Sequence, residues 1–339
     1  MAAEDALDLG LDVWLSPELW NHTPERTLAY LAEAARHAET IRTAAGVGAS
    51  ASAAAAPMAG RRERVVLSVA TEASFFLRGI LPGRTFAART KNPAAAIRAG
   101  RHVEPLAKFL ADAAAVARRE FGGPISYASL PFERVDWGLF DFVGVDHYRY
   151  VTSEPHYERI LERHLRHGKP LVITEFGMRA YRGAELDPDL LTTGLISWPT
   201  VALSARRVPF IRPRLQTGKA ARLQTGEPTH PQSSETTHPQ AGKATRPQAS
   251  KGPLRDEALQ ARRVAEDLAI FERMRVAGAF VTQFDEPLLT HDADPRFDLD
   301  MSGFSLVTTP QRKKKEAFHA VAHHYAGGPG RLGVPFSQP

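Results

Sequence analysis

The stretch Pro170-Leu-Val-Ile-Thr-Glu-Phe-Gly177 is a short apolar run that ends on a glutamate, Glu175. Earlier in the chain, Val65-Val-Leu-Ser-Val-Ala-Thr-Glu72 has the same form. Short apolar runs bounded by turn residues predict buried strands. In a parallel sheet wrapped by helices, the C-terminal end of a buried strand is where catalytic side chains are presented. The two stretches therefore predict an α/β fold that delivers Glu72 and Glu175 to one edge of its sheet.

Strands and helices are expected to alternate along most of the chain. Thr23-Pro24-Glu25 opens a helix, with Thr23 as its N-cap and Pro24 in the first helical position. Residues 43–60 are rich in Ala, Gly and Ser and are interpreted as a loose connection. The expected strands are 11–15, 65–70, 124–128, 140–146, 171–174 and 279–284, and further helices are expected at 102–121, 155–167, 256–276 and 312–325. This alternation predicts a parallel sheet with helices outside it, and the near-continuous apolar strands predict that both faces of the sheet are covered.

Six strands are fewer than the eight of a complete TIM (β/α) barrel, which takes about 250 residues. The segment before the first strand is too short for two more βα units. The sequence therefore predicts an N-terminally truncated barrel in which strands 3–8 are present and strands 3 and 8 are the edges. A start codon placed too far downstream is favoured over a genuine truncation, and the open edges favour aggregation. An open doubly wound sheet remains an alternative, although no glycine-rich loop follows the first strand.

Residues 204–253 interrupt this pattern. Glutamine recurs there every eight residues, and Arg-Leu-Gln-Thr-Gly occurs at 214–218 and again at 222–226. The repeat is proline-rich and nearly devoid of apolar residues, so we expect a disordered, dispensable insert. The chain then divides into 1–203 (strands 3–7), the insert 204–253, and 254–339 (helix 7, strand 8 and helix 8).

The composition of the chain disfavours several classes of function. The insert holds nine Lys and Arg against two Glu, so the net charge of +5 becomes −2 outside it, and nucleic-acid binding by the folded part is disfavoured. There is no cysteine, no apolar run of the ~18 residues that span a membrane, and no signal-peptide pattern at the start. We expect a cytoplasmic protein without cofactor, membrane or nucleic-acid partner; nothing in the sequence indicates an oligomeric state.

Two carboxylates on facing strand tips are the equipment for hydrolysis of a glycosidic bond. One carboxyl group protonates the leaving oxygen, and the other stabilises or traps the sugar cation. Glu72 and Glu175 fit these roles if their carboxyl groups lie about 5–5.5 Å apart, the separation of a retaining enzyme, rather than near 9 Å. Alternatively, either glutamate is a charge at a helix N-terminus or on the surface.

The segment Lys169-Pro-Leu-Val-Ile-Thr-Glu-Phe-Gly177 resembles the nucleophile strand of the clan A glycoside hydrolases, which are retaining (β/α)8 barrels. In that clan the acid/base glutamate ends strand 4 and the nucleophile ends strand 7. The resemblance implies that Glu72 is the acid/base and Glu175 the nucleophile. It also implies that Tyr148, which follows Asp146-His147, hydrogen-bonds the nucleophile. Carbohydrate is the substrate that this resemblance implies.

Three features depart from the clan pattern. Thr71 stands where asparagine normally precedes the acid/base, Phe284 and Asp285 stand where strand 8 usually presents tryptophan, and strands 1 and 2 with their arginine are missing. The segments 141–149, 255–261 and 294–300 also resemble actinobacterial proteins labelled abortive infection proteins, a label that implies a phage-defence role but no chemistry.

The remaining candidates are binding residues. Substrate-binding roles are predicted for the polar and aromatic residues near the strand tips: Trp14, Thr71, His147, Arg149, Phe284 and Asp285. A metal site built from Asp146, His147, Glu175 and Asp285 lacks a supporting spacing, so no metal is expected there. The acidic run from His291 to Asp300 has the composition of a calcium loop but is more often solvated. A carbohydrate-binding barrel without turnover is the main alternative to a hydrolase.

Overall fold

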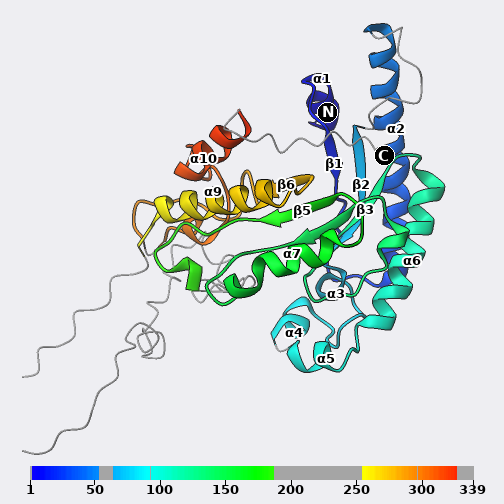
Figure 1. Cartoon of the computed structure of the whole chain (residues 1–339), viewed down its shortest axis with the longest axis horizontal. Coiled ribbons are helices and arrows are strands. Elements are labelled where there is room, and N and C mark those ends of the chain that lie inside the picture. The colour runs from blue at the N-terminus through cyan, green and yellow to red at the C-terminus, as the bar shows by residue number, and fades with distance from the viewer. Residues whose placement is uncertain (1, 53–63, 92, 187–253, 296, 327–339) are drawn as a thin grey trace, which may run out of the picture.

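The computed structural model describes residues 2–52, 64–91, 93–186, 254–295 and 297–326 (Figure 1). At its centre is one six-stranded sheet in the order β1-β2-β3-β4-β5-β6. The strands are β1 (Val13–Leu15), β2 (Val65–Thr71), β3 (Ile125–Ser129), β4 (Val143–Asp146), β5 (Leu171–Phe176) and β6 (Gly278–Val281). Every neighbouring pair is parallel. The sheet curls into a half-barrel whose edges are β1 and β6, which confirms the predicted barrel-type sheet of six strands.

Helices follow the strands as the alternation predicts. They are α1 (Ala2–Asp8), α2 (Pro24–Ser52), α3 (Ala73–Phe76), α4 (Phe86–Lys91), α5 (Ala94–Arg98), α6 (Val103–Glu120), α7 (Tyr157–Leu165), α9 (Glu257–Arg273) and α10 (Glu316–Tyr325). The long helices α2 and α6 pack side by side against β2 (Figure 1). The amide of Arg26 donates to the Thr23 hydroxyl, which is the predicted cap. The helices α1, α3, α4 and α5 were not predicted.

The interpretation of residues 43–60 as a loose connection is wrong in part, because α2 continues to Ser52. Alanine has the highest helix propensity, and an alanine-rich segment that follows an established helix prolongs it despite interspersed glycine. The predicted insert 204–253 lies outside the described residues, and its disorder stays a prediction. None of the helices in the described ranges has both the length and the apolar composition needed to cross a bilayer.

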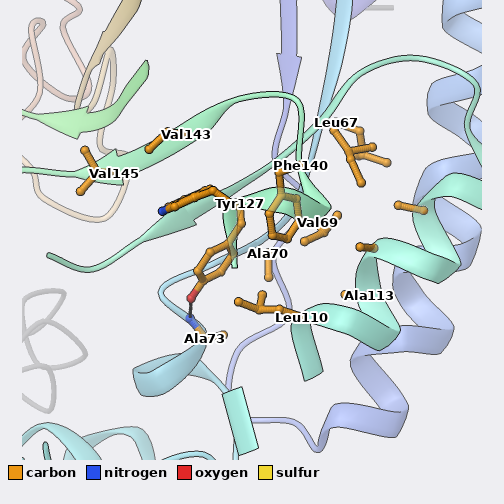
Figure 2. Packing of buried hydrophobic residues seen from close by; sticks show 14 of the residues in the cluster. Leu67, Val69, Ala70, Ala73, Leu110, Ala113, Tyr127, Phe140, Val143 and Val145 are labelled. Carbon is orange, nitrogen blue, oxygen red and sulfur yellow. Dashed lines mark hydrogen bonds between the residues drawn. The ribbon is translucent and has the colours of Figure 1, made fainter. Parts of the chain in front are cut away.

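The main core lies between the sheet and its helices. Strand side chains such as Leu67 and Val69 contact α6 residues such as Leu110 and Ala113 there, and Phe140 closes one end (Figure 2). The helices α2 and α6 bury one apolar face each against this core, since Leu31, Leu106 and Leu110 are each about 1% exposed or less. Each buried side chain of this size contributes roughly 1.5–3 kcal/mol to folding.

The inner face of the curled sheet encloses less space than the outer face, and it carries smaller residues. Side chains of Ser126 and Thr174 from the neighbouring strands lie close to Gly144, and a Cβ atom on Gly144 would come within 2.4 Å of the Tyr127 carbonyl oxygen. A second cluster on this face joins Val66, Phe142 and Val172. Small residues on the inner face leave space toward the C-terminal end of the strands.

Candidate active site

A cavity of about 180 Å³ opens at the C-terminal ends of the strands. It is lined by residues from the strands and from the segment after β1: Trp14, Ser16, Glu18, Thr71, Ala128, Thr174, Glu175 and Phe280. Its volume is below the ~300–1,000 Å³ of pockets that hold drug-sized ligands. The charged residues of this lining are Glu18 and Glu175, so the cavity presents carboxylates without a neighbouring lining cation.

Irregularities in strand pairing determine which side chains reach the cavity. The β2–β3 register shifts between Ser68 and Thr71, and the β5–β6 register shifts between Ile173 and Phe176. In a regular strand, Thr174 and Glu175 would point to opposite faces. A bulge re-aims side chains, and it allows both residues to line the cavity. The glutamate at the tip of β5 is therefore turned inward by backbone geometry.

Glu175 is held by Tyr148. The Tyr148 hydroxyl donates a hydrogen bond of 2.6 Å to Oε2 of Glu175, which is the contact that the resemblance implied. Burial raises the pKa of Glu175 to about 7, while the Tyr148 hydrogen bond opposes that rise and the charge of Glu18 adds to it. The carboxyl group is thus poised to ionise near neutral pH, with one oxygen already engaged.

Glu72 follows β2 in a left-handed backbone conformation, with φ 41° and ψ 46°. This conformation is uncommon for a non-glycine residue and costs on the order of 1–2 kcal/mol. Glu72 is buried, and burial together with the charges of Glu175, Glu133 and Glu18 raises the pKa of its carboxyl group well above the usual value. The protonated form of Glu72 is therefore favoured, next to a cavity that its neighbour Thr71 lines.

Behind Glu72 lies a buried polar network. The Ala73 amide donates to the Tyr127 hydroxyl at 2.9 Å (Figure 2), and this hydroxyl donates to Glu133 Oε2 at 2.7 Å. The Ser74 and Leu130 amides also donate to Glu133. The network fixes the backbone immediately after Glu72 and places a second carboxyl group close to it.

Asp146, at the tip of β4, is a third buried acid in this region. Its Oδ1 accepts a 2.6 Å hydrogen bond from the Thr174 hydroxyl, and its Oδ2 has no partner among the described residues. Burial and the charges of Glu175 and Glu72 raise the pKa of Asp146 well above its usual value. The protonated form of Asp146 is therefore favoured, and Asp146 is a second buried carboxyl group beside Glu175.

The structure does not bring His147 and Arg149 to the cavity. His147 stacks on Tyr157 at 4.0 Å, its Nε2 contacts the Tyr157 carbonyl oxygen, and burial lowers its pKa to about 4. Arg149 is buried in a network of ion pairs with Glu154, Glu266 and Asp267. The two residues alternate with Tyr148, so when Tyr148 faces Glu175 its neighbours face the helices.

Phe284 and Asp285 also lie away from the cavity, because β6 ends at Val281. Phe284 is 55% exposed, and Asp285 accepts hydrogen bonds from Thr309 and Arg312. Phe280 lines the cavity instead, and the centroid of its ring lies 5.6 Å from the centroid of the Trp14 ring. The alternation of side chains along β6 indicates this inward position of Phe280. Ala279 and Val281 pack on the outer core, so Phe280 between them faces inward.

Protein cations already pair with the acidic residues near His291. The cluster of His291, Asp298 and Asp300 has the proximity of a metal site. However, Arg255 contacts both carboxylates at 2.9 and 2.7 Å, and Lys315 lies 2.8 Å from Asp300. These ion pairs neutralise the cluster within the protein, and they tie α9 to the segment before α10.

Sequence reasoning found Trp14, Thr71, Glu72, Tyr148 and Glu175, which lie at or beside the cavity. It missed Glu18 because Ser16-Pro17 was interpreted only as the end of a strand. It also missed Glu133, whose contact with the Glu72 region depends on the fold of a loop after β3. Thr174 was passed over because regular alternation places it opposite Glu175.

Comparisons with known proteins identify the fold. One solved structure of a GH113 β-1,4-mannanase matches 96% of this chain and 77% of its own, with a TM-score of 0.50 and 12% identity. A complex of a GH113 β-1,4-mannanase matches 96% of this chain and 78% of its own at 11% identity, with a TM-score of 0.47. A GH2 β-galacturonidase from Eisenbergiella tayi, bound to galacturonate, matches 79% of this chain and 34% of its own at 15% identity, with a TM-score of 0.41.

No protein-family model and no curated protein matches the sequence. At identities this low the likeness concerns the fold alone, and the shared fold is the (β/α) barrel. None of the three neighbours described here bears on the abortive infection label, which stays a prediction.

Proposed function

We propose that this protein is a retaining glycoside hydrolase in which Glu175 is the nucleophile and Glu72 the acid/base. The observation that carries the proposal is the pair of glutamates at the tips of β5 and β2, of which Glu175 is held by Tyr148 and Glu72 is buried beside the cavity. The pKa of Glu175 is about 7, and burial together with the charge of Glu175 raises the pKa of Glu72 well above its usual value, so we assign the carboxylate to Glu175 and the proton to Glu72. Separated pKa values in neighbouring carboxyl groups are how glycosidases assign the two roles.

The proposed reaction has two steps. The Glu175 carboxylate attacks the anomeric carbon while Glu72 transfers its proton to the glycosidic oxygen, which leaves with the aglycone. Glu72, now a carboxylate, takes a proton from a water molecule that attacks the glycosyl ester and releases Glu175. Tyr148 holds Oε2 of Glu175, so Oε1 is the oxygen assigned to the attack. The carboxyl separation of about 5–5.5 Å stays a prediction.

The cavity lining favours a neutral sugar over a uronic acid. Glu18 and Glu175 are its charged residues, and a substrate carboxylate would be repelled by Glu18 and by ionised Glu175. The solved neighbour with a TM-score of 0.50 is a β-1,4-mannanase, and mannan is a neutral polysaccharide. We therefore propose a β-linked neutral glycoside as the substrate class.

Carbohydrate binding without turnover is the second candidate. The observation in its favour is the hydrogen bond between Ser16 Oγ and Thr71 Oγ1 at 2.9 Å, which occupies the side chain that precedes the proposed acid/base. A binding barrel would hold a sugar in the same cavity while Glu72 and Glu175 act only as hydrogen-bond partners.

A panel of nitrophenyl glycosides assayed with wild type, Glu175→Gln and Glu33→Gln separates the two candidates. Glu33 is an exposed residue of α2 and serves as the matched control. The hydrolase requires Glu175→Gln to lose orders of magnitude in kcat/KM while Glu33→Gln retains wild-type rates. Equal residual rates in all three proteins would identify contaminant activity and favour the binding role.

A further inference from the structure

Trp20 is an exposed aromatic residue whose ring packs on other aromatic rings. Its side chain is 49% exposed, yet its ring stacks on Phe76 with centroids 4.5 Å apart and planes 18° from parallel. Phe86 stacks on the same Phe76 ring at 5.3 Å. Trp20, Phe76 and Phe86 form a shelf, and Trp20 is its exposed member.

The shelf is held in one position by polar contacts. Arg89, which is 1% exposed, donates hydrogen bonds to the Phe76 carbonyl oxygen at 3.2 Å and to Asn21 Oδ1 at 3.1 Å. The amide of Asn21 donates to the same Phe76 carbonyl oxygen at 2.8 Å. The buried guanidinium of Arg89 thus connects α4, the last residue of α3 and the loop that carries Trp20. The exposed ring is therefore preorganised, which lowers the entropic cost of binding.

The shelf is continuous with the cavity through Glu18. The indole Nε1 of Trp20 donates a 2.9 Å hydrogen bond to Glu18 Oε2, and Glu18 lines the cavity. On its other side the shelf is built on α3, whose N-cap is Glu72. It therefore flanks the cavity on the side of the proposed acid rather than on the β5 side of Glu175.

We propose that Trp20 is the stacking platform for the sugar unit on the leaving-group side of the cleaved bond. This inference rests on the proposed function, because the acid must face the glycosidic oxygen and hence the unit that departs. The cavity is small, so a second sugar unit of an oligosaccharide needs a binding surface outside it. An aromatic face offers the apolar contact that the C–H face of a pyranose requires. The indole N–H of Trp20 already donates its hydrogen bond to Glu18, so the ring face stays available for stacking.

The test compares substrates that do and do not reach the shelf. A β-glycosyl fluoride has a leaving group too small to touch Trp20, whereas a β-1,4-linked trisaccharide of mannose or glucose extends over it. Trp20→Ala should lower kcat/KM for the trisaccharide by about tenfold or more and leave hydrolysis of the matching fluoride within about twofold. Trp20→Phe should fall between wild type and alanine. Tyr30→Ala, at an exposed aromatic residue of α2, is the control and should change neither rate.

Binding measurements separate this inference from the hydrolase proposal. Titration calorimetry of the same trisaccharides with Glu175→Gln, with and without Trp20→Ala, reports the shelf without turnover. A wild type that hydrolyses neither substrate would end the hydrolase proposal, while a tenfold weaker Kd in the Trp20→Ala background would still support the shelf. Equal loss on fluoride and trisaccharide, no loss on either, or no trisaccharide binding at all would overturn the role of Trp20.

Discussion

The Tyr148 hydroxyl lies 2.6 Å from Oε2 of Glu175 and donates a hydrogen bond to it. This contact joins the segment after β4 to the tip of β5, two segments that are adjacent in the sheet but separated in sequence. It lowers the pKa of Glu175 against the effects of burial and of Glu18. Tyr148 is therefore a positioning residue that also sets the pH at which the proposed nucleophile ionises.

Replacing Tyr148 by phenylalanine removes this donor. The pKa of Glu175 should rise, because the ionised carboxylate loses a hydrogen bond worth roughly 1.5 kcal/mol or more, and the acidic limb of the kcat/KM profile should move up by about one pH unit. Tyr157→Phe also loses a buried tyrosine hydroxyl, which donates to the His147 carbonyl oxygen, but it should not move the limb. An unshifted profile in Tyr148→Phe would contradict the assigned role.

Glu72 and Asp146 are both buried acids beside Glu175 with raised pKa values, and substitution distinguishes them. Glu72→Gln should lower kcat/KM by about 10²–10⁴-fold for alkyl glycosides, which need protonation of the leaving oxygen. The loss in kcat/KM should be far smaller for dinitrophenyl glycosides, because their phenolate leaves without being protonated. Asp146→Asn should not show this dependence on the leaving group. If the dependence appears in Asp146→Asn instead, Asp146 is the acid.

The fold could be predicted from apolar runs that alternate with helical patterns, because both are local signals. The two glutamates could be predicted because they end such runs. The bulges near Thr71 and Glu175 could not, since a register shift depends on how neighbouring strands pair. The failure at Phe284 has the same origin: the strand ends at Val281, and the inward ring is Phe280.

The buried carboxyl groups predict an unusual dependence of stability on pH. The folded-state pKa of Glu175 is about 7, above the usual value of 4.5, so the folded protein binds this proton more tightly than the unfolded chain does. The contribution of this proton to the free energy of unfolding is fully present below pH 4.5. It is lost as the pH rises to about 7, and it amounts to about 3 kcal/mol. Glu175→Gln should therefore gain in stability relative to wild type across this window. A constant difference between the two denaturant unfolding curves from pH 4.5 to 8 would refute this.

Glu18 is predicted to exclude acidic sugars. Wild type should hydrolyse neutral β-glycosides and reject the matching β-glucuronides, because Glu18 and Glu175 both repel a substrate carboxylate. Glu18→Gln keeps an acceptor for the Trp20 indole but removes one charge, so the glucuronide-to-glucoside ratio of kcat/KM should rise several-fold. Glu33→Gln is the matched control on α2. A wild type that prefers glucuronides would contradict the charge argument.

The central claim is that Glu175 forms a covalent bond to the sugar. A 2-deoxy-2-fluoro-β-glycosyl fluoride slows release of the glycosyl ester more than its formation, so the intermediate accumulates and can be located by peptide mass spectrometry. We predict one added glycosyl unit per chain, on the peptide that contains Glu175, with none in Glu175→Gln. An adduct on Glu72 or Asp146, or turnover of ordinary substrates with inverted product and no adduct, would contradict the account.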